Sequence, residues 1–359
     1  MPVGPREHGD QDALLLSARK GDEDAFRALV EAHLAELHAH CYRILSSYHD
    51  AEDAVQDALV RAWRALPTFE GRSSLRAWLY KVATNAALDI ARRRSRRELP
   101  VSHVPPVPTG GAPGAPLVET TWAEPYPDHQ VGERGLRLSP EASYDQRESL
   151  ELAFVVALQT LPASQRAALL LREVLGFSAA EIAEQLSTTV PAVTSALQRA
   201  RQTLTRRGAV PVQQQALRAL GDERARQLVE AFIDALERAD PALLVGLLTE
   251  DAAWTMPPLP SWYQGPTAIG QFLADFGFNE RWRHLPTSAN GQLALGCYTV
   301  DPATGTWVPS ALAVLSVRGE RVAEVDYFLT AELLGRWGDD SSIDGAEMFA
   351  RFGLPATVP

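Results

Sequence analysis

The sequence predicts a multidomain chain in which two all-α domains are followed by an α+β domain. Residues 10–98 and 141–208 repeat apolar side chains with the 3.6-residue period of amphipathic helices. Residues 218–337 begin with helical patterns and end in short strand-like runs, an order typical of an α+β domain. A chain of 359 residues is also too long for one ordinary hydrophobic core.

The first domain, residues 10–98, is predicted to contain three helices. One carries the periodic apolar residues of positions 25–37, and the next starts at Asp50 and stops at Pro67. The third starts at Ser73 or Ser74 and ends in a cluster of arginines at positions 92–97. Both later helices have a polar or acidic start, which suits the positive end of the helix dipole.

Residues 99–140 interrupt this pattern with proline and glycine, as in PVSHVPPVPTGGAPGAP. A segment so poor in apolar residues is predicted to be a flexible linker. It contains one island, WAEPYPD, which begins at Trp122 and ends at Asp128. Two aromatic residues among prolines fit a docking peptide or a locally collapsed linker, and the sequence does not decide between them.

The second domain, residues 141–208, is predicted to end in a helix-turn-helix. A helix over 150–161 is followed by another that Pro162 opens. Ser178 and Glu181 have the spacing of a capping box and predict a short helix over 179–186. A tight turn then leads to a longer helix with Pro191 near its start, and this order is typical of a DNA-binding helix-turn-helix.

The third domain, residues 218–337, is predicted to be α+β, and residues 338–359 form a C-terminal tail. A helix over 223–238 precedes a second short helix that runs into a strand. Three further strands are expected over 293–300, 307–317 and 321–329. Turn signals between them predict an antiparallel meander.

The charge distribution restricts where a polyanion could bind. The chain has a formal net charge of −11, yet residues 61–97 hold ten Lys and Arg against two Asp and Glu. Residues 208–359 hold ten against nineteen. A nucleic acid could therefore be held by the short basic segment, while the rest of the chain would repel it.

Several classes of protein are disfavoured by composition. No apolar run approaches the length of a membrane span, and the N-terminus lacks the pattern of a signal peptide, so a cytoplasmic location is expected. The two cysteines, Cys41 and Cys297, lie in different predicted domains and are expected to be core residues. A disulfide framework, a metal site and a cofactor are not expected.

Two groups of polar residues suit DNA binding. Melting and holding a single strand needs cations for phosphates and polar or planar groups for bases. On the first domain these are Arg72, Arg76, Lys81, Asn85, Arg92 and Arg93. On the last helix of the second domain, the outward residues are Thr189, Thr194, Ser195, Gln198, Arg199 and Arg201.

Both helical domains resemble a known family. The stretch DAEDAVQDALVRAWRALPTFEGRSSLRAWLYKVATNAALDIARRR resembles region 2 of extracytoplasmic-function sigma factors, and LQTLPASQRAALLLREVLGFSAAEIAEQLSTTVPAVTSALQRARQTL resembles their region 4. The resemblance implies a transcription initiation factor, not an enzyme. Its partners would be promoter DNA and core RNA polymerase, through the β′ clamp helices and the β flap.

The resemblance also assigns roles to positions. The helix that contains Asp53 and Arg64 would dock on the clamp helices, residues 69–93 would melt and read the −10 element, and residues 190–201 would read the −35 element. The residues implied to contact the polymerase are Asp53, Gln56, Asp57, Arg61 and Trp63.

The third domain resembles the SnoaL-like domains of the nuclear transport factor 2-like superfamily. That fold is a cone with an apolar pocket, and the candidate pocket residues here are Trp254, Met256, Trp262, Tyr263, Tyr298, Asp326 and Phe328. Asp326 alternates with apolar residues, so it is a candidate general acid or base if it points inward. Catalysis, small-ligand binding or intramolecular docking, and purely structural packing all remain open for this domain.

The whole chain is similar to the subgroup of these sigma factors that carries a fused SnoaL-like extension and an aromatic-proline linker motif. In that subgroup the extension takes the place of a separate anti-sigma factor. The resulting hypothesis is that the acidic C-terminal domain contacts residues 122–128 or the basic surface of the first domain. It predicts that the C-terminal domain changes promoter output.

Two other functions fit parts of the chain. A SnoaL-like hydrolase or isomerase with a DNA-targeting domain would need only one helix-turn-helix. A ligand-sensing repressor would also leave the helices of the first domain without a role. The presence of both sigma-like patterns favours the sigma factor.

Overall fold

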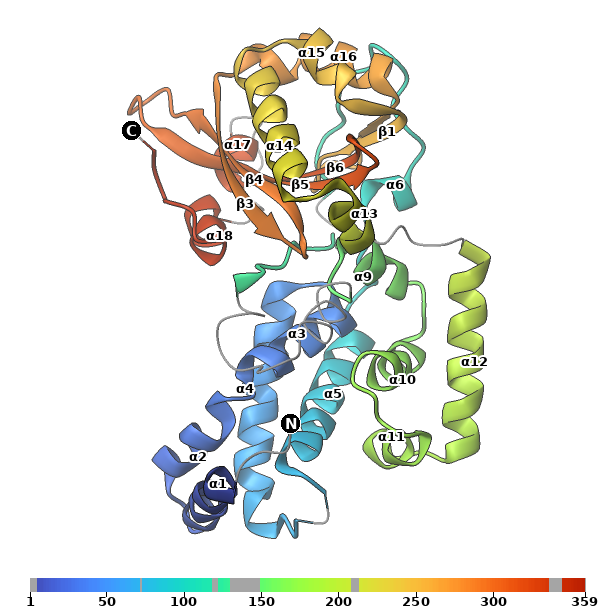
Figure 1. Ribbon diagram of the computed structural model, residues 1–359, viewed down its shortest axis with the longest axis vertical. Coiled ribbons are helices and arrows are strands. Elements are labelled where there is room, and N and C mark those ends of the chain that lie inside the picture. Colours follow the sequence, from blue (N-terminus) through green and yellow to red (C-terminus); the bar gives the residue numbers. More distant parts are fainter. Residues whose placement is uncertain are drawn as a thin grey trace. The chain divides into compact units, whose positions relative to one another are not determined.

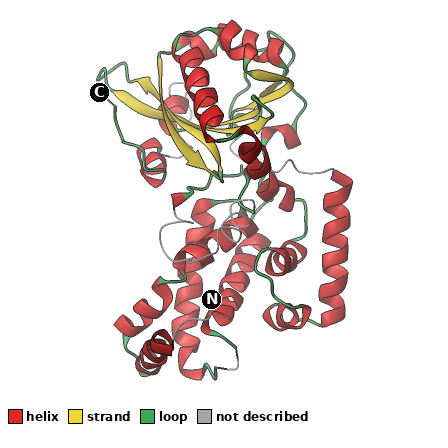
Figure 2. Cartoon of the chain, viewed as in Figure 1, coloured by secondary structure: helices red, strands yellow, loops and turns green. Residues whose placement is uncertain are grey.

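The computed structural model describes residues 5–71, 73–117, 122–129, 149–207, 213–335 and 344–358. They form two compact units (Figure 1). The helical unit draws on Met1–Arg96, Gln130–Ser149 and Ala157–Ala209, and the sheet unit on Arg97–His129, Leu150–Val156 and Val210–Pro359. All strands belong to the sheet unit (Figure 2). Arg72, residues 130–148, position 208 and positions 338–343 of the predicted tail lie outside the described residues.

The N-terminal part of the helical unit is a bundle of helices. They are α1 (Pro5–Ala18), α2 (Glu23–Glu31), α3 (Leu34–Leu45), α4 (Tyr48–Ala65), the short 3-10 helix η1 (Leu66–Thr68) and α5 (Leu75–Arg93). The single helix expected over 25–37 is wrong, because a turn at Ala32 and His33 separates α2 from α3. The apolar period continues across this turn, so periodicity alone did not reveal it.

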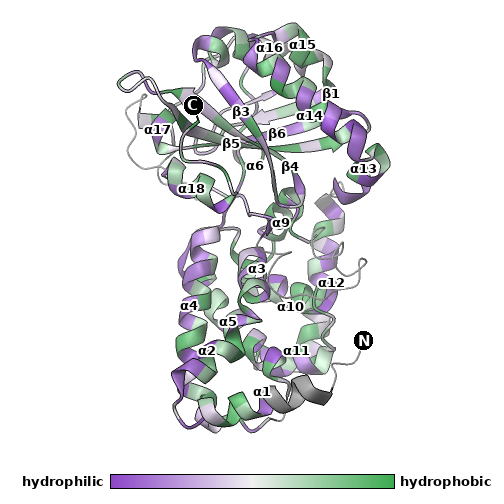
Figure 3. Ribbon diagram, turned by 60° about the vertical axis from the view of Figure 1, so that its left-hand side comes forward, coloured by the Kyte–Doolittle hydropathy of each residue, from purple (hydrophilic) through white to green (hydrophobic). Residues whose placement is uncertain are grey.

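Local capping explains where these helices start. Ser47 accepts a hydrogen bond from the backbone of Asp50 at the start of α4, so this helix begins two residues before the expected position. Ser74 caps α5 by accepting from the backbone of Ala77, which confirms the expected start. In Figure 3, α4 carries both hydrophilic and hydrophobic residues, and its buried positions recur every three to four residues, as in an amphipathic helix.

The second set of helices forms the expected helix-turn-helix. They are α9 (Leu152–Leu158), α10 (Ala163–Glu173), α11 (Ala179–Gln185) and α12 (Val190–Arg207). Ser178 and Glu181 make both hydrogen bonds of the predicted capping box. Val193, Leu197 and Ala200 are buried on the inner side of α12. The helix expected over 150–161 is shorter at both ends.

The sheet unit is built on one six-stranded sheet. The strands are β1 (Leu248–Thr255), β2 (Trp262–Gln264), β3 (Trp282–Ala289), β4 (Gln292–Val300), β5 (Trp307–Arg318) and β6 (Arg321–Leu329), in the order β2-β1-β6-β5-β4-β3. Strands β3 to β6 form an antiparallel meander, of which β4 to β6 were predicted, and β1 runs parallel to β6. The sequence analysis did not identify β2 or β3.

Helices cover both faces of this sheet. They are α6 (Pro100–His103), α13 (Gln213–Leu220), α14 (Asp222–Glu237), α15 (Pro241–Gly246), α16 (Pro266–Asp275), the 3-10 helix η2 (Gly277–Asn279), α17 (Ala331–Leu334) and α18 (Gly345–Arg351). We call the face that carries Trp254, Cys297 and Tyr327 the helix face, since α13 to α17 pack on it. The other face carries Tyr298 and Phe328 and is covered by α18. At Gly296 on this second face, a Cβ atom would lie 2.4 Å from Leu354 and 3.1 Å from Phe349, so glycine permits the close approach of the α18 segment.

The linker predicted over residues 99–140 is, over residues 99–117 and 122–129, a packed part of the sheet unit. Leu99 and Ala123 belong to the core on the second face of the sheet. The sequence analysis missed this because the segment is held mainly through its backbone: Val107 N–H donates to the Trp262 carbonyl, and the Val104 carbonyl accepts from the Trp262 indole. A segment with few apolar side chains can be ordered in this way by hydrogen bonds to distant residues.

Both cysteines are buried core residues, as expected. No described helix is long and apolar enough to cross a membrane.

Candidate polymerase, promoter and ligand interfaces

Helix α4 presents an exposed polar stripe. Asp53 and Gln56 are exposed and lie three residues apart, which places them on one side of the helix. The side chains of Asp57 and Arg61 form an ion pair with 2.5 Å between their nearest atoms, and Arg61 also pairs with Asp89 of α5 at 2.8 Å. This network raises the pKa of Arg61, chiefly through the hydrogen bond to Asp89. Arg61 therefore ties α4 to α5 and is held at one edge of the stripe.

An apolar groove lies beside this stripe. Trp63 packs against Phe26 of α2 with 5.1 Å between ring centroids, and both line the groove with Leu59 and Val60. Its rim carries charged residues such as Glu23 and Arg64. An apolar groove with a charged rim is a surface suited to a protein partner. Of the residues implied to contact polymerase, the structure thus places Trp63 in the groove and Asp53 and Gln56 on the exposed stripe.

The residues expected to bind the −10 element do not form one free basic surface. Lys81 lies 3.8 Å from Glu184 of α11, and Asn85 donates to the Lys81 carbonyl within α5. Arg92 forms an exposed ion pair with Asp89, and Arg93 is exposed at the end of α5.

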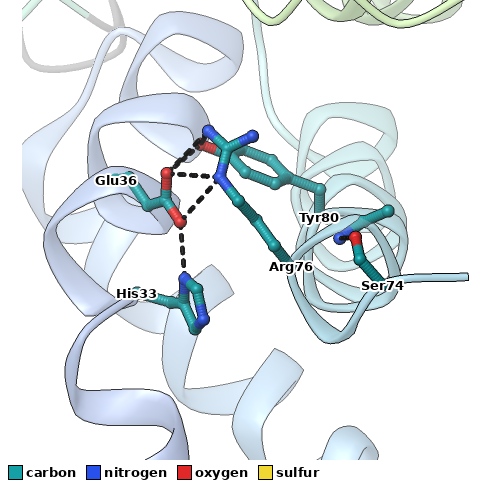
Figure 4. A network of polar contacts seen from close by, with 6 residues as sticks. His33, Glu36, Ser74, Arg76 and Tyr80 are labelled. Atoms are coloured by element: carbon teal, nitrogen blue, oxygen red, sulfur yellow. Dashed lines mark hydrogen bonds and ion pairs between the residues drawn. The ribbon is translucent and has the colours of Figure 1, made fainter. Parts of the chain in front are cut away.

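Arg76 differs most from expectation, because its guanidinium is engaged within the protein. It donates to both carboxylate oxygens of Glu36 in α3, which also accepts from Tyr80 and contacts His33 Nδ1 (Figure 4). Burial raises the pKa of Glu36, but the hydrogen bonds from His33 and Arg76 more than offset this and hold the pKa below its usual value. Arg76 therefore neutralises a buried carboxylate, and its contact with phosphates stays a prediction.

Helix α12 offers the exposed residues that the sequence analysis expected. Thr189, Thr194, Ser195, Gln198, Arg199 and Arg201 are all exposed. Thr189 caps the helix by accepting from the backbone of Ala192, and Arg201 pairs with Glu173 of α10. Ser195, Gln198 and Arg199 thus form the most accessible polar set on this helix.

The helix-turn-helix is fixed to the end of α3 by a buried polar contact that the sequence did not indicate. Arg166 of α10 is buried and donates to the carbonyls of Ile44 and Leu161. Gln159 donates to the same Ile44 carbonyl and to Ser46 Oγ. Burial, followed by the charge of Arg96, lowers the pKa of Arg166 to about 10. These donors satisfy carbonyl groups that a helix end leaves without partners.

The island at residues 122–128 docks on the turn between β3 and β4. Asn290 and Gly291 form this turn with positive φ angles of 56° and 69°, as a two-residue hairpin loop requires. Asn290 exchanges two hydrogen bonds of 2.8 Å with the backbone of Tyr126, and its side-chain amide donates to the Leu150 carbonyl. The Gly291 N–H donates to the Asp128 carboxylate at 2.7 Å. Tyr126 is fully buried, so this segment is a docked peptide.

A cavity of about 440 Å³ lies on the helix face of the sheet. Trp254 of β1, Phe272 of α16 and Tyr327 of β6 contribute to its largely apolar lining, and residues 112–116 form one wall. Of the seven candidate pocket residues, Trp254 and Met256 lie in the lining.

The other five candidates lie outside the lining: Trp262, Tyr263, Tyr298, Asp326 and Phe328. Asp326 and Tyr298 alternate along their strands with Tyr327 and Cys297, which face the cavity side, so both point to the second face. Trp262 donates its indole N–H to the Val104 carbonyl outside the lining. The alternation of Asp326 with apolar residues correctly predicted a strand. The face of the sheet to which Asp326 points was predicted wrongly, because that face depends on how β6 pairs with β1 and β5.

Comparisons with known proteins cover nearly the whole chain. Residues 29–97 match the family described as Sigma-70 region 2, residues 151–204 match Sigma-70, region 4, and residues 229–325 match the SnoaL-like domain. The ECF RNA polymerase sigma factor SigG of Mycobacterium tuberculosis is 40% identical over 332 residues, which cover 90% of this chain and 86% of the relative. The chain belongs to the extracytoplasmic-function sigma factors.

Two further similarities agree with this membership. The ECF RNA polymerase sigma-E factor of Escherichia coli strain K12 is 30% identical to this sigma factor over 191 residues, or 53% of this chain and 90% of the relative. The crystal structure of the Mycobacterium tuberculosis sigma factor SigJ superposes with a TM-score of 0.54 at 20% identity, covering 86% of this chain and 98% of the other. The second similarity concerns the fold, including the C-terminal extension. Sigma factors are not a class of enzymes.

Some functional residues of this sigma factor were missed by sequence reasoning. The Asn290-Gly291 pair is a strong hairpin signal between two strands and was available in the sequence. Phe26 was identified only as a periodic core position, although it forms part of the groove with Trp63. The roles of Glu36 and of residues 112–116 depend on contacts distant in sequence and had no local signal.

Proposed function

We propose that this sigma factor binds core RNA polymerase through α4 and the adjacent groove, and directs initiation at specific promoters. The single observation that carries the proposal is its 40% identity over 332 residues to a sigma factor. The exposed Asp53 and Gln56 and the groove residue Trp63 supply polar and apolar contacts for the β′ clamp helices. Region 4, which contains α10 to α12, is proposed to reach the β flap.

The proposed promoter contacts follow the exposed polar residues. Lys81, Asn85, Arg92 and Arg93 would contact the −10 element, with Arg76 serving to hold α3 against α5. Because Lys81 lies 3.8 Å from Glu184, DNA would have to replace this contact with the helix-turn-helix. Ser195 and Gln198 would read base edges of the −35 element, and Arg199 would contact phosphate.

We propose further that the SnoaL-like domain regulates the sigma factor through residues 122–128. The hydrogen bonds between Tyr126 and Asn290 support this proposal, because they fasten the segment between the two promoter-reading regions to the domain. The domain would act without catalysis. Glu280 is the one carboxylate in the cavity lining, and Asp326 and His284 are absent from that lining. As a partner of core polymerase, the protein would work in the cytoplasm.

The test is run-off transcription with core RNA polymerase on a promoter pool. Promoter-specific transcripts are expected with the full chain, and a complete lack of transcripts would contradict the sigma role. Regulation is tested with Asn290→Gly, which keeps the positive φ of the turn but removes the side-chain hydrogen bonds to Tyr126 and Leu150. Glu320→Ala, at the turn between β5 and β6, is the matched control.

Promoter output is expected to change with Asn290→Gly and to stay constant with Glu320→Ala. Point substitution is preferable to deletion of residues 209–359, since deletion would also expose the core of the docked segment. Equal output from Asn290→Gly and the unaltered chain would refute the regulatory part and leave the sigma role standing.

A further inference from the structure

Helix α12 begins with an apolar side chain that the fold leaves in solvent. Val190 is the first residue of the helix and is 44% exposed, whereas Val193 and Leu197 of the same helix are buried. A single exposed valine is common on protein surfaces, so its place in the fold decides whether it has a function. Val190 is not needed by the core of the helical unit, and it lies within the helix-turn-helix.

The position of Val190 is one that meets base edges in such a motif. The turn between α11 and α12 is tight, with Ser187 at a positive φ of 51°, and Val190 follows it at the start of the second helix. The N-terminal residues of that helix contact bases in the major groove. Val190, Thr194 and Gln198 are exposed and follow one another at intervals of four residues, which places them on one side of α12. Val190 therefore shares a surface with Gln198, which is proposed above to read a base edge.

This part of the motif carries no charge. From Gln185 to Gln198 the sequence contains no Lys, Arg, Asp or Glu, and the cations of α12 begin at Arg199. Guanine is specified most often by a bidentate contact from Arg or Lys, which these residues cannot make. An apolar side chain instead recognises thymine, through contact with its C5-methyl group. The uncharged start of α12 thus favours an A·T pair.

The hydroxyl groups beside Val190 are engaged within the helix. Thr189 Oγ1 accepts from the backbone N–H of Ala192 at 3.3 Å, and Thr194 donates its hydroxyl to the Val190 carbonyl at 3.0 Å. The Thr194 hydroxyl hydrogen is therefore used inside the first turn of α12. The side chain of Val190 has only apolar surface to offer a partner.

The Val190 side chain is held in place before DNA binds. Thr189 caps the helix, and Pro191 in the first turn has a fixed φ and no N–H that would need a partner. A β-branched side chain has one strongly preferred rotamer in a helix. Little conformational entropy is therefore lost when Val190 is buried against a base, and most of the hydrophobic gain is retained.

We propose that Val190 contacts the C5-methyl group of a thymine in the −35 element and is a specificity-determining residue of this sigma factor. The inference rests on the proposed function of α12 as the reader of that element. It adds the identity of one base pair, an A·T pair opposite the start of the helix.

The test compares thymine with deoxyuridine, which lacks only the methyl group and keeps every hydrogen bond of the base pair. A promoter selected from the pool by the unaltered holoenzyme is resynthesised with one deoxyuridine at a time in the −35 element, on either strand. Competition binding by the holoenzyme then measures the affinity for each DNA. At one position, loss of the methyl group should weaken binding about fourfold, the value of one buried methyl group. The Val190→Ala holoenzyme should bind the thymine and deoxyuridine forms of that promoter equally.

Two further variants assign the effect to this side chain. Val190→Ile keeps a branched apolar group and should retain the preference for thymine over deoxyuridine. Val101→Ala changes a valine of α6 that is 42% exposed, and should also retain it. Because Val190 is exposed and alanine favours helix, Val190→Ala should fold normally, which its circular dichroism spectrum checks.

A −35 element without thymine on either strand, or one in which deoxyuridine is tolerated at every position, would overturn the inference. So would an equal loss in Val190→Ala and the unaltered chain, since another residue would then contact the methyl group. In each of these cases the role of α12 stands if exchanging whole base pairs of the −35 element still weakens binding. Binding that is indifferent to every such exchange would refute that role, and the inference with it.

Discussion

Arg76 of α5 and Glu36 of α3 are joined by hydrogen bonds of 2.7 and 2.9 Å between the guanidinium and one carboxylate oxygen, with a third of 3.2 Å to the other oxygen. The Glu36 side chain is 4% exposed and that of Arg76 is 39% exposed. The burial of the Glu36 carboxylate therefore depends on the Arg76 guanidinium, whereas water can still reach Arg76. This asymmetry means that the structural role of Arg76 can be tested in the absence of DNA.

We predict that Arg76→Met destabilises the bundle by about 2–3 kcal/mol, because it leaves a buried carboxylate without its cation. Arg76→Lys should recover only part of the loss, since an amine cannot donate in the same forked geometry. Hydrogen exchange of the α3 and α5 amides measures the effect. Lys81→Ala is the matched control and should leave exchange unchanged. Unchanged exchange in Arg76→Met would contradict the structural role of Arg76.

The pattern of the sequence predicted those elements whose signals are local. The capping box at Ser178 and Glu181 located α11, and Ser74 located the start of α5. Strand β6 was predicted with the bounds that it has, because turn residues flank an apolar run. In each case the deciding interactions lie within a few residues, so they can be read from one stretch of sequence.

The site required long-range information that a single sequence does not contain. Glu36 and Arg76 are forty residues apart, and their charges gave no sign of the pairing. The face to which Asp326 points depends on the register of β6 against β1 and β5. Residues 97–117 looked disordered because their partners, such as Trp262, follow about 150 residues later.

The −35 contacts make separable predictions at two exposed residues of α12. Gln198→Ala should reduce the free energy of promoter binding by about 1–3 kcal/mol. It should also relax the preference for one base pair of the −35 element. Arg199→Ala should weaken binding to all promoters and reduce the dependence of log K on log[salt] by about one. Fluorescent promoter binding by the holoenzyme at several salt concentrations measures both. Gln227→Ala changes an exposed glutamine of α14 and is the control. A base-specific loss of promoter binding in this control would refute the assignment of Gln198 to a base contact.

The buried Arg166 predicts a stability effect within the helical unit. Arg166→Met should destabilise the contact between α10 and the end of α3 by about 2–4 kcal/mol, since the Ile44 and Leu161 carbonyls lose a charged donor. Faster hydrogen exchange at the end of α3 is the expected readout. Arg226→Met, at an exposed i,i+3 ion pair, should have no measurable effect. Equal exchange in both variants would contradict the stabilising role of Arg166.

The two cysteines should be unreactive in the folded protein. Burial raises the pKa of both Cys41 and Cys297 to about 12, so little thiolate is present at pH 8. We predict that 5,5′-dithiobis(2-nitrobenzoic acid) modifies neither thiol in native protein and both in guanidinium chloride. Rapid reaction of a native thiol, located by mass spectrometry, would show that its part of the core opens readily.

Asp326 predicts an unusual pH dependence of the sheet unit. Burial, followed by the charge of Glu324, raises the pKa of Asp326 to about 7. The hydrogen bond from Thr255 lowers the pKa but does not offset these effects. The folded state thus holds a proton that the unfolded chain releases near pH 4. The protonated Asp326 carboxyl contributes at most about 4 kcal/mol to the stability of the sheet unit. This contribution is fully present below pH 4 and is lost as the pH rises to about 7.

Asp326→Asn isolates this effect, because the amide keeps an acceptor for Thr255 and carries no charge. Differential scanning calorimetry between pH 5 and pH 8 should show a melting temperature of the sheet unit that falls with pH in the unaltered chain and falls less in the variant. The variant should therefore be the more stable protein at pH 8. The difference between the two curves reports on residue 326 together with Glu324, whose charge interacts with it. Parallel curves would mean that Asp326 is ionised in the fold, and that water or a cation reaches the second face of the sheet.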